Sequence, residues 1–83
     1  MENRFGTISI FIKPDKCPIT KLNDLLSKYS DIILGRMGIP NPEQNINVIC
    51  LVIYGDTDQL GSLTGKLGLL NGIQVKSYLY KPE

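Results

Sequence analysis

The segment that most restricts the fold of this chain is the run NINVICLVIY, from Asn45 to Tyr54. Apolar residues fill both alternating sets of positions in it, which predicts a strand that is apolar on both sides. Such a strand lies inside a sheet, and both faces of that sheet need cover. A chain of 83 residues is too short to cover both faces of such a sheet with its own helices or loops.

Three other segments are also predicted to be strands. They are rich in β-branched and aromatic residues, and the last of them alternates apolar with polar side chains. In the first, Ile8, Ile10 and Ile12 share one side, as a half-buried strand requires. We expect these strands over Arg4–Ile12, Asp31–Ile39 and Ile73–Leu79.

Glycine and proline interrupt the region around the second of these strands. Gly35 or Gly38 is expected to mark a bulge or a close approach of another group. The segment from Pro40 to Pro42 is predicted to be a loop, because proline cannot donate a hydrogen bond to a sheet ladder.

Two helices are predicted between the strands. The first has Pro18 in its first turn, where proline is tolerated, and runs to about Tyr29. The second begins at Asp56, which can form a capping box with Gln59, and ends at Gly72, a left-handed residue after the last turn. Apolar stripes face the core at Ile19, Leu22, Leu25, Leu26 and Tyr29 in the first helix and at Leu60, Leu63, Leu67 and Leu70 in the second.

The elements follow one another in the order βαββαβ. This order predicts an α+β, ferredoxin-like sandwich, in which two helices cover one face of a four-stranded antiparallel sheet. We expect a single domain over residues 1–83, because the chain is too short for two cores. The opposite face of the sheet stays bare, so we expect a homo-oligomer or a partner protein that covers it.

Composition excludes several classes of protein. Nine Lys and Arg residues balance eight Asp and Glu residues to a net charge of +1, without the basic block that direct nucleic-acid binding needs. The longest apolar run, Val48 to Ile53, is far shorter than the ~20 residues of a membrane helix. No signal peptide is evident, so a cytoplasmic protein with free thiols is expected.

The segment GSLTGKLGLLNG, from Gly61 to Gly72, looks at first like a phosphate-binding loop. Its first two glycines are separated by three residues rather than four, and Leu67 stands after Lys66 where Ser or Thr would hold magnesium. Three glycines in one helix cost roughly 2 to 3 kcal/mol relative to alanine. We therefore expect Gly61, Gly65 and Gly68 to allow close packing of the helix against a neighbouring group. The alternative is that the N-terminus of the helix binds an anion, although the negative charges of Asp56 and Asp58 would oppose this.

The two cysteines are the remaining candidates for chemistry. Cys50 lies in the apolar third strand and is expected to be a small buried hydrophobe. Cys17 stands at a helix start, which can lower a thiol pKa, although loop packing is the favoured interpretation because the chain has no His to act as its base. Asp56 and Asp58 form only a fragment of a calcium loop, so helix capping is favoured. We expect no metal, no cofactor and no catalytic pair.

Several segments together show a resemblance to a known family. They are Arg4-Phe5, Leu22–Leu26, Asp31–Leu34, Leu51-Val52, Asp56–Gly61, Gly65–Gly68 and Asn71–Lys76. Over nearly the whole chain the sequence resembles small regulators of the iron-only hydrogenase system. Such proteins are similar to ACT-type ligand-sensing domains and to the metal-sensing half of nickel-responsive repressors. This similarity implies a dimer or tetramer that binds and responds to a small-molecule effector.

The resemblance transfers no ligand residue. Nickel sensors of that type use histidines, which this chain lacks, and amino-acid-binding ACT domains commonly have a glycine where this chain has the loop Lys13–Pro18. We expect no DNA-binding segment, so if the protein regulates transcription, a partner would have to contact the DNA. The leading hypothesis is a non-enzymatic regulatory domain that binds a small molecule or a partner protein at a subunit interface. The alternatives are a purely structural interaction module and a small ferredoxin-like enzyme.

Overall fold

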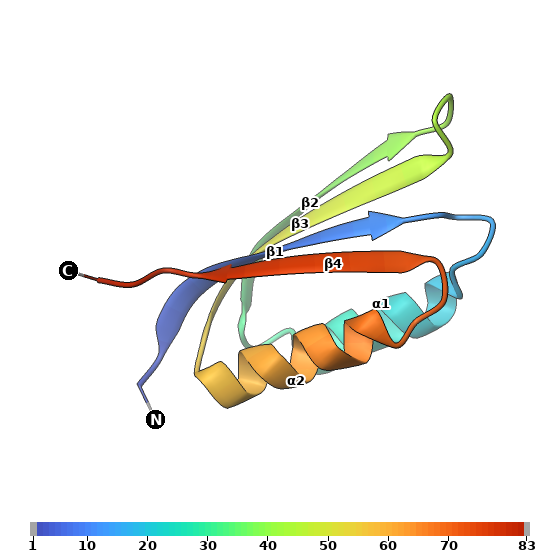
Figure 1. Ribbon diagram of the computed structural model, residues 1–83. Helices are drawn as coiled ribbons and strands as arrows, with labels where there is room; N and C mark the ends of the chain where they lie inside the picture. Colours follow the sequence, from blue (N-terminus) through green and yellow to red (C-terminus); the bar gives the residue numbers. More distant parts are fainter. Residues whose placement is uncertain (1, 83) are drawn as a thin grey trace.

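The computed structural model describes residues 2–82 and contains four strands and two helices in the order βαββαβ (Figure 1). Their bounds are β1 Arg4–Ile12, α1 Ile19–Lys28, β2 Ile33–Asn41, β3 Ile46–Gly55, α2 Thr57–Gly68 and β4 Ile73–Leu79. Each predicted element is present, and most of the predicted ends lie within two residues of the observed ones.

The strands form one antiparallel sheet in the order β2-β3-β1-β4. Both helices lie on the same face of this sheet, and β2 and β4 form its two edges (Figure 1). The ferredoxin-like α+β fold is therefore confirmed, with β3 and β1 as its two inner strands.

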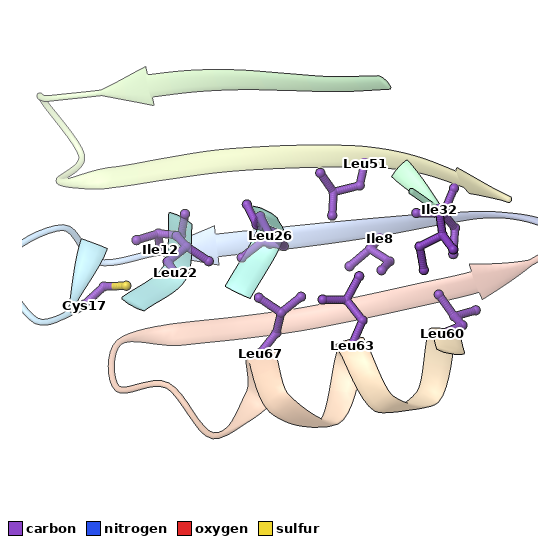
Figure 2. Close-up of a cluster of buried hydrophobic side chains, with 12 residues drawn as sticks. Ile8, Ile12, Cys17, Leu22, Leu26, Ile32, Leu51, Leu60, Leu63 and Leu67 are labelled. Carbon is purple, nitrogen blue, oxygen red and sulfur yellow. The ribbon is translucent and has the colours of Figure 1, made fainter. Parts of the chain in front are cut away.

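Register places one alternating set of side chains between the sheet and the helices. Ile8 pairs with Leu51 across β1 and β3, and Ile10 pairs with Ile49 two residues further along. Figure 2 shows the α2 side chains Leu60, Leu63 and Leu67 pointing into the same layer. The buried core consists of Ile8, Ile10, Ile12, Cys17, Leu22, Leu26, Ile32, Leu51, Ile53, Leu60, Leu63 and Leu67.

The start of α2 is held by the predicted capping box. The Asp56 carboxylate accepts a hydrogen bond from the Gln59 backbone N–H at 2.8 Å, and the Gln59 side-chain oxygen accepts one from the Asp56 N–H at 3.0 Å. Two of the otherwise unpaired N–H groups of the first turn region are satisfied in this way. Asp56 therefore has a structural role as the N-cap of α2.

The predicted end of α2 was about two residues too late. The helix ends at Gly68, and the chain then turns before β4. Gly72 still has the expected left-handed backbone, with φ of 74°. Its carbonyl accepts a hydrogen bond from the Lys13 N–H at 2.8 Å, which joins this turn to the loop after β1.

Replacing Gly72 with alanine is expected to destabilise the fold by about 1–3 kcal/mol, because a non-glycine residue is strained at positive φ. The new Cβ would also lie 3.0 Å from the Lys16 Cβ and the Cys17 backbone nitrogen. For a domain of this size the melting temperature should fall by at least ~4 °C. Thermal unfolding measures the change, and the neighbouring Asn71→Ala variant is the control. Equal melting temperatures for the two variants would contradict this explanation.

The prediction that Pro40 lies in a loop was wrong. Pro40 pairs with Asn47 at the far end of β2, and the strand continues to Asn41. A proline fits there because β2 is an edge strand, where its missing N–H can face away from the ladder. The predicted bulge is confirmed at the other end of the same strand, between Ile33 and Gly35.

Candidate binding surfaces

The side of the sheet away from the helices is predominantly apolar over β2 and β3 and near both ends of β1. Side chains on this side alternate with the buried core residues, so Phe5 stands opposite Tyr54 and Phe11 stands opposite Val48. We call this surface the open face. Its apolar members are Phe5, Phe11, Met37, Ile39, Val48, Cys50, Val52, Tyr54 and Tyr78.

Large apolar side chains on the open face are accessible to water. Val52, near the middle of β3, is 46% exposed, and Met37 on the neighbouring strand is 56% exposed. Phe5 and Tyr54 pack against each other at one end, with ring centroids 4.7 Å apart. A contiguous apolar surface of this kind usually marks an interaction site. The structure thus agrees with the prediction that the third strand is apolar on both sides.

The polar part of the open face lies along β4 and the adjacent side of β1. Thr7 and Ser9 project from β1 toward this side, and Lys76 stands beside Ser9 on β4. The face is therefore divided into an apolar part over β2 and β3 and a more polar strip at the β4 edge. Such a polar rim beside an apolar centre is typical of protein interfaces.

The two thiols differ in their environments, and neither matches a reactive site. Cys17 is only 7% exposed and packs in the core, and burial raises the pKa of its thiol. Its burial agrees with the favoured interpretation of loop packing. Cys50 is half-buried on the open face between Ser9 and Met37, so in the single chain it is less buried than predicted.

The glycines of α2 have no packing partner within the described chain. A Cβ added at Gly61, Gly65 or Gly68 would find nothing within 4 Å. Within the single chain, the close packing that we expected of these glycines is therefore not seen. All three lie on the exposed side of α2, opposite to the buried leucines.

A second surface lies on the helix layer, where a hollow of about 360 Å³ separates α1 from α2. At one side of it the Tyr29 hydroxyl and the Ser62 Oγ share a hydrogen bond of 2.7 Å. The Lys66 Nζ lies over the Tyr29 ring, 5.5 Å from its centroid, as in a cation–π contact. We call this hollow the helix groove, and its lining residues are Lys21, Asp24, Leu25, Lys28, Lys66, Leu69 and Leu70.

The contacts around Tyr29 also affect its acidity. The hydrogen bond with Ser62, and then the interaction with Lys66, hold the pKa of the Tyr29 phenol below its usual range. Both effects favour the charged form of the ring hydroxyl. This cluster leaves no pattern in the sequence, since Tyr29 and Ser62 are 33 residues apart and only the pairing of the helices brings them together.

The described residues offer no group of three or more Cys, Asp or Glu side chains that could hold a metal ion. Asp58 lies in the first turn of α2 beside the capping residue Asp56. Between residues 2 and 82, neither helix is long and apolar enough to cross a membrane.

Comparison with known proteins places the chain among proteins of the same fold. Residues 4–77 match the model of the TM1266-like family, whose description reads "Iron-only hydrogenase system regulator, putative". The chain belongs to the TM1266-like family. The solved structure of the uncharacterized protein TM1266 from Thermotoga maritima is 38% identical in sequence and has a TM-score of 0.92, with 96% of this chain and 100% of that chain covered.

A second solved structure shares the fold of this TM1266-like chain at much lower identity. The C-terminal domain of the MgtC protein from Mycobacterium tuberculosis is 13% identical, with a TM-score of 0.72, and the match covers 93% of this chain and 87% of that one. At this identity the likeness concerns the fold alone. The comparison with curated proteins found no match.

Proposed function

We propose that this chain is a cytoplasmic, non-enzymatic regulatory domain that acts as a homo-oligomer and reads a small molecule or a partner protein. The family description supports a role in regulating an iron-only hydrogenase system. The observation that carries the proposal of assembly is the open face, where Phe11 of β1, Met37 of β2 and Val52 of β3 are all exposed.

A second copy of the same chain is the partner that fits this face best. The molecule measures 41 Å and 22 Å along its two longer axes, so the sheet side is on the order of the ~800 Å² that each partner buries in a stable interface. Two sheets pack face to face at ~10 Å, with their inner side chains interdigitated. A two-fold axis over the open face would cover the apolar surface of both copies at once.

The position of Cys50 provides a direct test. Native mass spectrometry of the full chain, purified from its own host, should show a dimer or tetramer and any retained small molecule. In that assembly Cys50 should react slowly with a thiol reagent, and it should react faster when dilution separates the subunits, because thiol reactivity needs access. Cys17 should stay unreactive in both states, since it is buried and the pKa of its thiol is raised.

A Cys50→Ser variant, which retains only Cys17, is the control for this measurement. It should show almost no labelling at any protein concentration. A monomeric mass together with labelling of Cys50 that does not depend on protein concentration would contradict the proposed assembly.

A further inference from the structure

The helix groove has an excess of positive charge. Lys21 and Lys28 line it from α1, and Lys66 lines it from α2. Asp24 is the one acidic residue among the lining residues, so three positive charges face one negative charge. Since the whole chain has a net charge of +1, this concentration of lysines is local. The groove therefore attracts anions, at a range that salt limits to roughly 10 Å.

The other lining residues of the helix groove are apolar. Leu25 and Leu70 are half-buried between the helices. Leu69, just after the end of α2, is 86% exposed, the highest value among the large apolar side chains of the described residues. A leucine that exposed gains nothing from the fold of the isolated chain. An apolar group placed against these leucines would remove their surface from water.

One of the three lysines is already oriented. Lys66 lies over the Tyr29 ring, and the Tyr29 hydroxyl is fixed by Ser62 from the same helix as Lys66. A lysine held in this way loses less conformational freedom when it binds an anion than a free side chain would. The arrangement thus combines a positioned cation, two further lysines and an apolar floor.

We propose that the helix groove binds a small amphipathic anion, that is, a carboxylate, sulfonate or phosphate ester on a compact aromatic or branched aliphatic body. Its acid group would lie between Lys21 and Lys66, and its apolar part would cover Leu25, Leu69 and Leu70. A hollow of about 360 Å³ is within the size range of small-molecule sites, ~300–1,000 Å³. As a statement about regulation this inference rests on the proposed function, because it names the class of effector. As a binding site it does not require the oligomer.

The probe for this site is 8-anilinonaphthalene-1-sulfonate, an aromatic sulfonate whose fluorescence rises in apolar surroundings. It is titrated into the full-length chain and into a Lys21→Gln/Lys66→Gln double variant. Loss of two of the three lysines should weaken binding about tenfold, which corresponds to roughly 1.4 kcal/mol. The matched control is Lys76→Gln, which removes a lysine from the open face and should change the affinity by less than about twofold.

Amide chemical shifts locate the probe on the chain. The expected shifts lie in residues 21–29 and 62–70, and few should occur at residues 48–54 of the open face. Equal affinity of the double variant and the wild type would overturn the proposal. So would shifts confined to the open face, or equally tight binding of the uncharged analogue N-phenyl-1-naphthylamine.

The oligomeric state is measured on the same samples, so that the two proposals fail separately. A monomer that binds the probe in the helix groove overturns the assembly and leaves this site intact. An oligomer in which the double variant binds the probe as tightly as the wild type overturns the site and leaves the assembly intact.

Discussion

Replacing Val52 with aspartate should convert the assembled protein into folded monomers. Val52 lies near the middle of β3, opposite Thr7 on β1 and Gly35 on β2, at the centre of the open face. A carboxylate buried there against a second copy costs several kcal/mol when it has no partner. A two-fold interface would contain two such carboxylates. The dissociation constant should therefore rise by more than about a hundredfold, which corresponds to roughly 3 kcal/mol.

The same substitution should affect the fold of the isolated chain much less. Val52 is 46% exposed in the single chain, so its aspartate variant keeps its charge in water. The loss is limited to the lower strand preference of aspartate, within ~1 kcal/mol. Circular dichroism should show unchanged secondary structure, while light scattering or native mass spectrometry shows the mass of one chain.

Ile19→Asp is the matched control for the Val52 variant. Ile19 is 41% exposed, like Val52, but it is the first residue of α1, away from the open face. An acidic residue in the first turn of a helix is favourable, so this variant should stay folded and assembled. A Val52→Asp protein that is folded and still oligomeric would show that another surface joins the subunits.

The fold could be predicted from the sequence because its signals are local. The two-sided apolar pattern of β3, the leucine stripes of the helices and the capping box at Asp56 each depend on a few neighbouring residues. Each was found where the pattern placed it. The order of elements then selects the sheet topology, because few arrangements of βαββαβ bury both helices on one sheet.

The errors concern features that depend on tertiary position. From the sequence alone Pro40 is predicted to lie in a loop, because only the order of the strands shows that β2 is an edge strand, which tolerates proline. Cys50 is predicted to be buried because its neighbours in sequence are apolar, and only the pairing of β3 with β1 shows that it lies on the face without helices. The composition of a segment shows which residues are apolar, but the side on which they lie follows from the pairing of distant strands.

The helix groove could not be predicted for the same reason. Tyr29, Ser62 and Lys66 are ordinary helix residues in the sequence, and Lys21 and Lys28 look like a solvated face of α1. Their common site arises when α1 and α2 lie side by side on the sheet. The signal that could have identified it is the presence of charged and aromatic residues on the outer sides of two predicted neighbouring helices.

Substituting alanine for all three glycines of α2 should stabilise the domain by about 2–3 kcal/mol. Each glycine lowers the helix preference by about 0.8–1 kcal/mol relative to alanine. At Gly61, Gly65 and Gly68 an added Cβ meets no atom within 4 Å, so no steric cost offsets the gain. The melting temperature should rise by on the order of 10 °C.

Gly6→Ala provides the opposite case in the same chain. A Cβ at Gly6 would lie 2.8 Å from the Tyr78 carbonyl oxygen and 3.2 Å from a methyl carbon of Leu79, so this variant should lower the melting temperature. Thermal unfolding at several protein concentrations, with the mass measured alongside, separates stability from assembly. A triple alanine variant with a lower melting temperature or a lost oligomer would mean that the glycine side of α2 contacts another molecule. The gain expected here follows only if the subunits meet through the open face, since that arrangement leaves the outer side of α2 in water.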